Sequence, residues 1–462
     1  MKGHYHLIGI GGIGMSAIAQ LLLKRGEKVS GCDVKESSII AALRKKGAEV
    51  FIGHDPAHIG AADTVVYSSA IRKDNPEFRA ASSARGVRLL KRAEALAMLM
   101  HDRSVVTVSG SHGKTTTASL AACLLLDAGM CPTVAVGGIL RNIDTNACLG
   151  EGDFFVAEAD ESDGSFLCYR PHYSIITNID YEHLDHYGDF ESQKSAFSRF
   201  ISQTRENGRI FACADDPVLK DLVQASGKDC TFFGLNSDAD AYPGDIRING
   251  LSSEFDFHYH RQRIGRFFLP LGGMHNVSNA LAVIALGLEL GIASEQIKKT
   301  LASFRGAHRR LEIKFQDSEV CVIDDYAHHP TEIKATLAAV RNLKPGRLVA
   351  VFQPHRYTRT RLLLDEFAAC FSDADYLAVT DIYSAGEQPI TGITAELLSQ
   401  KAAERNPHKR IDFVPRERLL SHLMGIIKPH DVVVMLGAGD IIKVCEELAG
   451  SIAQARWSCA SS

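Results

Sequence analysis

Short apolar runs, glycine or polar turns and amphipathic stretches follow one another in three separate parts of this chain. In the first part, the apolar run Tyr5–Gly9 is followed by glycines, by helical apolar spacing over Met15–Leu23 and by a second run, Lys28–Asp33. A strand, a glycine turn, a helix and another strand in this order are typical of a parallel βαβ unit. The pattern therefore predicts a βαβ unit at the N-terminus.

The same alternation returns twice. In the middle of the chain, a predicted strand at Ser104–Ser109 leads into a predicted helix over Lys114–Asp127, and further strands are predicted at Asp153–Ala157 and Tyr173–Thr177. Four more strands, separated by helical stretches, are predicted near the C-terminus at Glu319–Ile323, Arg347–Phe352, Tyr376–Thr380 and Asp431–Leu436.

A chain of 462 residues exceeds the ~100–200 residues of an ordinary domain. Polar stretches near His101 and near Leu311–Glu312 precede new strands, and we place domain boundaries there. The chain is thus predicted to have three α/β domains: a Rossmann-like domain over 1–101, a central domain of the P-loop type over 102–312 and a second Rossmann-like domain over 313–462.

Composition narrows the class of protein. Hydrophobic residues make up 45%, charged residues 23% and the net charge is −4, so no basic field favours nucleic acid or membrane surfaces. Eleven cysteines without CxxC pairs fit a reducing compartment. The longest apolar stretch, Ala280–Ala293, contains Glu289 and is too short to cross a bilayer. We expect a cytoplasmic protein without a targeting segment, a membrane span or a nucleic-acid partner.

The most informative turn lies between the predicted strand and helix of the middle domain. It comprises Gly110, Ser111, His112, Gly113, Lys114, Thr115 and Thr116. Backbone N–H groups at such a turn bind phosphate, Lys114 would reach the β- and γ-phosphates, and Thr115 would ligate Mg²⁺. Val108 stands where the full P-loop pattern has glycine, so this is a shorter relative of that pattern. The alternative is a polar helix cap with a surface lysine.

Two polar segments follow strands of the same domain. The segment from Ala157 to Asp163 carries four carboxylates, which repel one another unless a cation or hydrogen-bond donors lie nearby. The segment from Thr177 to His186 adds His183 as a possible second metal ligand. Carboxylates at the end of a strand that faces a phosphate turn suit a divalent ion. The alternatives are a solvated acidic loop and a structural histidine.

The N-terminal glycines match the dinucleotide-binding fingerprint, with Asp33 at the end of the second strand. The pattern indicates that a diphosphate approaches bare backbone, as in NAD or a UDP-sugar, unless the glycines only permit tight packing. In the C-terminal domain, the segments Asp324–Pro330 and Gln353–Thr360 each follow a strand. Arg356 and Arg359 could hold a carboxylate; a metal site and a charged surface are the alternatives.

Together these motifs resemble the Mur ligase family. The resemblance spans all three domains and is carried by six stretches: His6–Ser16, Glu158–Leu167, Gly273–Ala280, Arg309–Glu312, Asp324–Glu332 and Phe352–Thr360. It implies that ATP phosphorylates a carboxylate and that an incoming amine attacks the acyl phosphate. The chain is most similar to the members that add L-alanine to the lactyl carboxylate of UDP-N-acetylmuramate in peptidoglycan synthesis.

The resemblance also implies roles for single residues. The implied catalytic residues are Lys114, Glu158, His183, Arg310 and His328, and the implied Mg²⁺ ligands, for two ions, are Thr115, Glu158 and His183. ATP would be bound by the turn from Gly110 to Thr116 and by His275, Asn276 and Asn279. The UDP-substrate would be bound by Gly9, Gly11, Gly12, Gly14, Asp33 and Ser69, and the amino acid by Tyr326, His355, Arg356 and Arg359.

Departures from the family pattern are mild. Ala327, Ser111 and Gly273 stand where Gly, Thr and Pro are usual, and Lys194 is not assigned as a carbamylated metal ligand because its spacing from His183 differs. Two alternatives remain: a ligase that recycles a preformed tripeptide onto UDP-N-acetylmuramic acid, and a nicotinamide-dependent oxidoreductase. We expect a monomer or weak homodimer.

Overall fold

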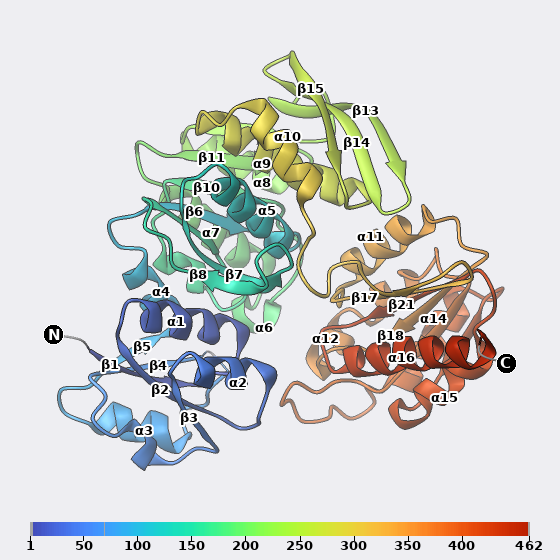
Figure 1. The fold of residues 1–462 in the computed structure, drawn as a ribbon, viewed down its shortest axis with the longest axis horizontal. Coiled ribbons are helices and arrows are strands. Elements are labelled where there is room, and N and C mark those ends of the chain that lie inside the picture. Colours follow the sequence, from blue (N-terminus) through green and yellow to red (C-terminus); the bar gives the residue numbers. More distant parts are fainter. Residues whose placement is uncertain (1–2, 69, 461–462) are drawn as a thin grey trace. The chain divides into compact units, whose positions relative to one another are not determined.

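The computed structural model describes residues 3–68 and 70–460 and separates into two compact units. The first unit comprises Met1–Gly244, Asp256–Phe267 and Ser278–Gly306, and the second comprises Asp245–Phe255, Phe268–Val277 and Ala307–Ser462. Three sheets and their covering helices are visible in Figure 1. No helix within the described ranges is both long enough and apolar enough to span a membrane.

The N-terminal sheet is wholly parallel, with strand order β3-β2-β1-β4-β5. Its strands are β1 (His4–Ile8), β2 (Lys28–Asp33), β3 (Glu49–Ile52), β4 (Thr64–Tyr67) and β5 (Arg88–Lys91). Its helices are α1 (Ile13–Lys24), α2 (Ser38–Lys45), α3 (Pro76–Ser83), α4 (Arg92–Leu99) and the 3₁₀ turn η1 (Pro56–Ile59). The strand order reverses at β1, so the glycine turn after β1 lies where α/β sheets bind ligands.

The central sheet has the order β15-β14-β13-β12-β11-β10-β6-β9-β7-β8. Its strands are β6 (Ser104–Ser109), β7 (Thr133–Leu140), β8 (Thr145–Cys148), β9 (Phe154–Glu158), β10 (Tyr173–Ile176), β11 (Arg209–Cys213), β12 (Cys230–Phe233), β13 (Ala241–Asn249), β14 (Ser252–Tyr259) and β15 (Gln262–Leu269). Strand β6 pairs in parallel with both β10 and β9. The phosphate turn after β6 therefore also lies at a reversal of strand order.

Helices and short turns of the central region connect these strands. They are α5 (Lys114–Asp127), η2 (Ser165–Cys168), α6 (Leu184–Tyr187), α7 (Phe190–Ser202), α8 (Pro217–Ser226), α9 (Met274–Glu289) and α10 (Ser294–Ser303). Helix α5 begins at Lys114, directly after Gly113, whose left-handed backbone ends the turn. Helix α5 is buried along most of its length, because it packs on β6, β7, β9 and α10.

The C-terminal sheet has the order β16-β17-β21-β18-β19-β20, in which only β16 pairs antiparallel. Its strands are β16 (Glu312–Gln316), β17 (Val320–Asp325), β18 (Arg347–Phe352), β19 (Tyr376–Val379), β20 (Arg410–Phe413) and β21 (Asp431–Leu436). Its helices are α11 (Pro330–Arg341), α12 (Tyr357–Leu362), α13 (Leu364–Ala369), α14 (Ala395–Arg405), α15 (Arg416–Ile426) and α16 (Ile441–Ala460).

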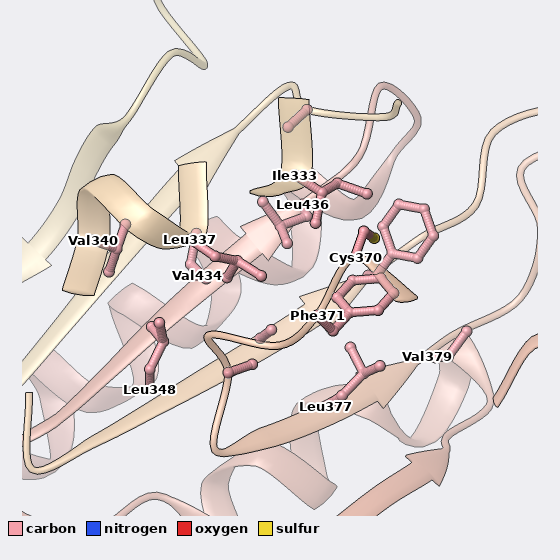
Figure 2. Packing of buried hydrophobic residues seen from close by; sticks show 14 of the residues in the cluster. Ile333, Leu337, Val340, Leu348, Cys370, Phe371, Leu377, Val379, Val434 and Leu436 are labelled. Atoms are coloured by element: carbon pink, nitrogen blue, oxygen red, sulfur yellow. The ribbon is translucent and has the colours of Figure 1, made fainter. Parts of the chain in front are cut away.

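Both faces of the C-terminal sheet bury apolar side chains. On one face, α11, α13 and α14 cover the sheet, and Figure 2 shows Leu337 and Val340 of α11 near Leu348 and Val434 of the strands. On the other face, α15 and α16 pack on a second cluster that includes Val433. Strands buried on both sides explain the continuous apolar runs in the sequence.

The predicted α/β organisation is confirmed, and most predicted strands and helices lie within two residues of the observed ones. The sequence prediction names no counterpart for the observed strands β3, β4, β5, β7, β8, β11, β12, β13, β14, β15, β16 and β20. Along β13, β14 and β16, polar and charged residues alternate with apolar ones, as the half-buried patterns of β13 and β14 show. Such segments lack the continuous apolar runs that mark the other strands.

Candidate active site

The turn between β6 and α5 requires glycine at both ends. Gly110 has a φ of +121° and Gly113 a φ of +83°, values that L side chains rarely adopt. A Cβ at position 110 would clash with Oγ1 of Thr177, and one at position 113 would lie 2.7 Å from Oδ1 of Asn279. The turn thus leaves bare backbone at the N-terminus of α5, which suits an anionic phosphate.

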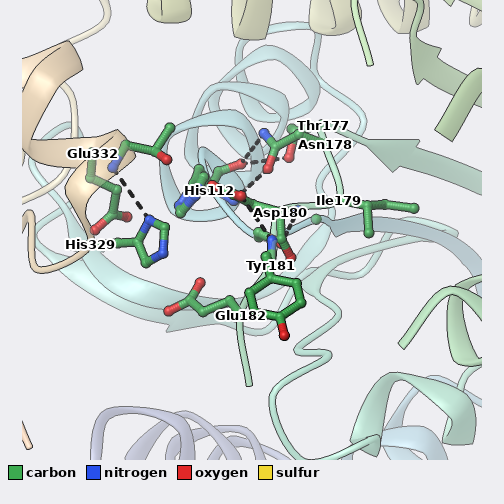
Figure 3. A network of polar contacts seen from close by, with 12 residues as sticks. His112, Thr177, Asn178, Ile179, Asp180, Tyr181, Glu182, His329 and Glu332 are labelled. Carbon is green, nitrogen blue, oxygen red and sulfur yellow. Dashed lines mark hydrogen bonds and ion pairs between the residues drawn. The ribbon is translucent and has the colours of Figure 1, made fainter. Parts of the chain in front are cut away.

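Residues after β10 hold this turn in place, as Figure 3 shows. The N–H of His112 donates to Oδ1 of Asn178 at 2.9 Å, and the carbonyl of His112 accepts from Oγ1 of Thr177 at 2.5 Å. Nε2 of His112 lies 2.8 Å from a carboxylate oxygen of Asp180, and Oγ of Ser111 accepts the N–H of Asp180 at 2.9 Å. The turn is therefore fixed before any phosphate binds.

Lys114 points its ammonium into the turn. Nζ donates to the carbonyl of Gly110 at 2.6 Å, to that of Ser111 at 3.2 Å and to Oε1 of Glu161 at 2.7 Å. Burial by itself lowers the pKa of Lys114, but the carboxylates of Glu161 and Asp160 outweigh it and raise the pKa above its ordinary value. The Lys114 ammonium therefore stays positively charged at physiological pH, beside the backbone N–H groups of the turn that suit phosphate.

The acidic segment contributes a carboxylate that sequence reasoning did not single out. Glu161 is fully buried, and one of its oxygens, Oε2, has no hydrogen-bond partner among the described residues. The predicted metal ligand Glu158 instead accepts the N–H of Gly137 at 2.8 Å. A buried carboxylate oxygen without a donor is costly unless a cation meets it. The donor set therefore fits a divalent ion, with Glu161 added to the predicted ligands.

His183 joins the same group of side chains. Its Nε2 lies 3.6 Å from Glu161 and 3.6 Å from Glu182. Burial lowers the pKa of His183, but these two carboxylates outweigh it and raise the pKa overall. The residue has a φ of +60°, a backbone strain of the kind found at functional sites. Thr115, half-buried in the first turn of α5, completes the predicted set.

The N-terminal glycine turn is held by the strand beside it. The N–H groups of Gly9 and Ile10 donate to the carbonyl of Cys32 at 2.9 and 3.0 Å, and the N–H of Gly11 donates to a carboxylate oxygen of Asp33 at 2.9 Å. Asp33 therefore stabilises the turn, in addition to the ligand contact that the sequence motif predicts.

An arginine from α4 lies against the same turn. A Cβ on Gly14 would lie 2.7 Å from Nη1 of Arg92, and Nη2 of Arg92 lies 3.5 Å from Asp160. Gly12 donates its N–H to the carbonyl of Gly9 at 3.2 Å. Arg92 places positive charge beside a turn suited to a diphosphate, and no motif marks it in the sequence. Ser69, the remaining predicted residue here, lies outside the described residues.

In the second unit, two arginines that precede β16 lie against Tyr326, which follows β17. The guanidinium carbons of Arg309 and Arg310 lie 5.0 and 5.3 Å from the ring centroid of Tyr326. Arg309 also donates to Asp324 at 3.2 Å, and Arg310 lies 3.6 Å from Glu332. Tyr326 and Arg310, both predicted site residues, are therefore neighbours.

The remaining predicted residues of this unit follow β17 and β18. The rings of His328 and His355 are 5.7 Å apart, and His355 stacks on Tyr383 at 5.6 Å. Nη1 of Arg359 lies 3.3 Å from Nδ1 of His355. Burial, then His328 and Arg359, lower the pKa of His355 to about 3. His355 is consequently a neutral hydrogen-bonding group at physiological pH.

Arg356 and the first turn of α9 complete the predicted set. Arg356 has a φ of +71°, and its N–H donates to the carbonyl of Tyr383 at 2.8 Å. Burial, then Arg310, lower the pKa of His275 to about 4. The amide nitrogen of Asn276 donates to the carbonyl of Gly272 at 2.8 Å. Asn279 lies against Gly113, as described above, so it lies beside the phosphate turn.

Three family descriptions match consecutive parts of the chain: "Mur ligase family, catalytic domain" over residues 4–104, "Mur ligase middle domain" over 108–287 and "Mur ligase, glutamate ligase domain" over 309–439. The chain belongs to the Mur ligase family. Membership confirms the resemblance seen in the sequence. It also argues against the nicotinamide-dependent oxidoreductase alternative, because all three matching descriptions name a ligase family.

Relatives of this Mur ligase are similar over nearly their whole length. A UDP-N-acetylmuramate–L-alanine ligase of Desulfatibacillum aliphaticivorans is 46% identical over 97% of this chain and 99% of its own. One of Aquifex aeolicus is 45% identical over 96% of both chains. The crystal structure of UDP-N-acetylmuramate-alanine ligase from Thermotoga maritima superposes with a TM-score of 0.83 at 30% identity, covering 98% of this chain and 100% of that one.

A structure with less sequence similarity shows the fold only. The murein peptide ligase of Psychrobacter arcticus has a TM-score of 0.71 at 24% identity, covering 96% of this chain and 98% of its own. The three-domain α/β architecture predicted for this Mur ligase is therefore confirmed by structures as well as by family descriptions. Sequence reasoning did not single out Glu161 or Arg92, and the geometry adds them as candidate site residues.

Proposed function

We propose that this Mur ligase joins L-alanine to the lactyl carboxylate of UDP-N-acetylmuramate, with ATP converted to ADP and phosphate. The observation that carries the proposal is the near-full-length identity, 44–47%, to relatives named UDP-N-acetylmuramate–L-alanine ligase. The phosphate turn with Lys114 supports it, because that turn supplies the charge and backbone donors that a phosphoryl transfer needs.

The proposed reaction has two steps. A lactyl carboxylate oxygen attacks the γ-phosphorus of ATP, the bond from that phosphorus to the β–γ bridging oxygen breaks, and ADP leaves. The amine of L-alanine then attacks the carbonyl carbon of the acyl phosphate, the carbon–oxygen bond to phosphate breaks, and the amine loses a proton. Lys114 and the N–H groups of residues 110–113 offset charge on the phosphates in the first step. We assign Arg310 and His328 to the acyl phosphate.

Mg²⁺ is part of the proposal, with two ions expected. The unpaired buried oxygen of Glu161, together with Thr115, Glu158 and His183, forms a set of oxygen and imidazole donors that suits this cation. When bound, Mg²⁺ neutralises phosphate charge and draws electrons from the transferring group. His183 must be neutral to act as a ligand, so its raised pKa favours proton over metal at low pH.

Each substrate is assigned its own residues. The glycines at 9, 11, 12 and 14, with Asp33 and Ser69, are proposed to bind the UDP part of UDP-N-acetylmuramate. His275, Asn276 and Asn279 are proposed to bind the adenine side of ATP. The amino acid is assigned to Tyr326, His355, Arg356 and Arg359, with an arginine on the alanine carboxylate.

The deciding experiment measures ADP release with UDP-N-acetylmuramate and a series of amine substrates. We expect release only when ATP, the UDP-sugar and an amine are all present, with L-alanine giving the highest kcat/KM. A clear preference for the tripeptide L-alanyl-γ-D-glutamyl-meso-diaminopimelate would contradict the proposal. Lys114→Ala should lower kcat by about 10²–10³-fold with an unchanged circular dichroism spectrum, and Lys194→Ala serves as the control on the same unit.

The proposal also covers the domain boundaries, location, partners and oligomeric state of the protein. We propose domains at 1–101, 102–312 and 313–462, a cytoplasmic location, no nucleic-acid or membrane partner, and a monomer or weak homodimer. Light scattering after size exclusion, with and without ATP and UDP-N-acetylmuramate, tests the oligomeric state. A stable higher oligomer would contradict that part of the proposal.

A further inference from the structure

A second cluster of metal-binding side chains lies inside the N-terminal sheet, and the proposed reaction does not use it. His6 extends from β1, Cys32 from β2 and Glu77 from α3, and all three are fully buried. One ligating atom of each lies within 4.8 Å of the others. Three different kinds of ligand therefore converge from elements far apart in the sequence.

The contacts centre on the Glu77 carboxylate. Nε2 of His6 lies 3.0 Å from Oε2 of Glu77, and Sγ of Cys32 lies 2.7 Å from the same oxygen. A fourth donor stands beside them: Nδ1 of His54 is 3.2 Å from Sγ of Cys32 and 3.7 Å from Oε1 of Glu77. Two imidazoles and a thiol thus lie around the carboxylate of Glu77.

We propose that His6, Cys32, His54 and Glu77 form a binding site for a divalent transition metal, with Zn²⁺ as the best-suited ion. Thiolate, imidazole and carboxylate are the ligands that Zn²⁺ takes in four-coordinate sites. Tetrahedral bonds of about 2.0–2.3 Å place neighbouring ligand atoms about 3.3–3.6 Å apart. The His6–Glu77, Cys32–Glu77, His54–Cys32 and His54–Glu77 separations lie between 2.7 and 3.7 Å, and the ligating atoms of His6, Cys32 and Glu77 all lie within 4.8 Å of one another. Side-chain adjustments would bring them to that geometry.

Surrounding groups orient these ligands as they do in metal sites. Nδ1 of His6 is 2.9 Å from Oγ of Ser30, which leaves Nε2 directed at the cluster. Oε1 of Glu77 accepts the N–H of Asp55 at 3.1 Å and lies 2.9 Å from Nδ1 of His58. Outer contacts of this kind fix ring orientation and tautomer and raise metal affinity.

The site is also reachable and linked to the glycine turn. The side chains of His54 and His58 are 18% and 19% exposed, which gives an ion a path from solvent. On binding, the thiol proton of Cys32 leaves to solvent as the metal–sulfur bond forms, so the charge balances. The carbonyl of Cys32 accepts the N–H groups of Gly9 and Ile10. A bound ion would consequently stiffen the turn assigned to UDP.

The alternative is a buried hydrogen-bonded network that only joins β1, β2 and α3. Both readings explain why the groups are buried together, because buried polar groups need partners. They differ in one measurable respect: only a metal site requires the thiol to lose its proton to an ion. The experiment therefore measures whether the Cys32 sulfur bonds to an added metal ion.

The test uses the full-length protein stripped with a chelator and dialysed against Co²⁺ or Zn²⁺. We expect a single tight equivalent of Zn²⁺ and, with Co²⁺, thiolate-to-cobalt charge-transfer absorption together with the intense visible bands of tetrahedral coordination. Cys32→Ser should abolish the charge-transfer band, and Cys32→Ser and His54→Gln should each weaken Zn²⁺ binding by about 100-fold or more. Cys321→Ser, a buried cysteine of β17, is the matched control and should bind like wild type.

Two results would overturn the proposal. One is wild-type protein that retains no Zn²⁺ after dialysis, which would identify the cluster as a hydrogen-bonded network. The other is an unchanged Co²⁺ spectrum in Cys32→Ser. Because Glu77→Gln could unfold the N-terminal sheet, the partly exposed His54 provides the second variant, and circular dichroism confirms that each variant is folded.

Discussion

Nζ of Lys114 lies 2.7 Å from Oε1 of Glu161, inside a turn whose carbonyls accept the same ammonium. The Lys114 ammonium would therefore interact with Glu161 and with a phosphate bound in the turn at the same time. Its second oxygen has no donor among the described residues, so the carboxylate has a lone pair for a second cation. We infer from this arrangement that Glu161 links the lysine to the proposed divalent ion.

Replacing Glu161 with Gln tests that link. The amide keeps the shape but removes the charge, so we expect the Mg²⁺ concentration for half-maximal activity to rise about tenfold or more and kcat to fall about 10²-fold. Titrating ADP release with Mg²⁺ measures both. Glu191→Gln, an exposed carboxylate of α7, should behave like wild type. An unchanged Mg²⁺ dependence would assign Glu161 a structural role only.

The crowding at Gly113 predicts that alanine there lowers the free energy of unfolding more than alanine does at Gly129, which follows the other end of α5. Gly113→Ala adds a Cβ 2.7 Å from Oδ1 of Asn279 at a φ of +83°. Gly129→Ala, after the C-terminus of α5, has a φ of +72° but meets nothing within 4 Å. We expect about 1–2 kcal/mol of destabilisation at Gly129, more at Gly113, and an increased KM for ATP only at Gly113.

Urea denaturation and initial-rate kinetics measure these two effects. Adding Asn279→Ala to Gly113→Ala removes the clash but leaves the backbone strain, so part of the lost stability should return. Equal destabilisation at the two glycines would contradict the packing argument.

Arg92 should contribute to UDP-substrate binding without taking part in the chemistry. Its guanidinium lies beside Gly14 and 3.5 Å from Asp160. Arg92→Met keeps most of the length but removes the charge, so we expect the KM for UDP-N-acetylmuramate to rise about tenfold, with a smaller change in kcat. Arg79→Met, on the exposed side of α3, provides the control. A fall in kcat with unchanged KM would contradict this assignment.

Acid should destabilise the second unit through two half-buried histidines, His275 and His355. The pKa of His355 is lowered to about 3 and that of His275 to about 4, whereas both titrate at about 6.5 in an unfolded chain. Between these values the unfolded state binds more protons. Stability therefore falls as the pH drops below about 6.5, by up to about 1.4 kcal/mol per pH unit for each histidine.

Urea denaturation at several pH values between 7 and 5 checks this slope. His355→Asn should flatten it, whereas His408→Asn, at an exposed position, should leave it unchanged. A slope that is the same in both variants would exclude His355 as its source.

The sequence predicted best where one residue pattern has one physical solution. Strand β6 and helix α5 were predicted to the residue, because an apolar run, a glycine and an opening lysine permit little else. The antiparallel edge strand β16 and the strands β13, β14 and β15 alternate polar and apolar residues and were missed. Their pairing depends on neighbours distant in the sequence, which a local pattern does not contain.

The site shows the same limit. Among the four carboxylates between residues 158 and 163, the spacing does not reveal which one turns toward Lys114, and the structure shows Glu161 there. Arg92 stands alone in the sequence and becomes informative only when Gly14 and Asp160 lie beside it. The glycines and the lysine of the phosphate turn are recognisable from a local sequence pattern. Glu161 and Arg92 are brought to their positions by tertiary packing, which a local pattern does not show.

The chain passes back and forth between the two compact units before it enters its last long segment. Residues 245–255 and 268–277 belong to the second unit, although each precedes residues of the first unit. Neither unit is therefore a continuous piece of the gene. A recombinant fragment cut at residue 306 would therefore keep two segments that pack with the second unit, and fragments for crystallisation or binding studies need a boundary chosen in space as well as in sequence.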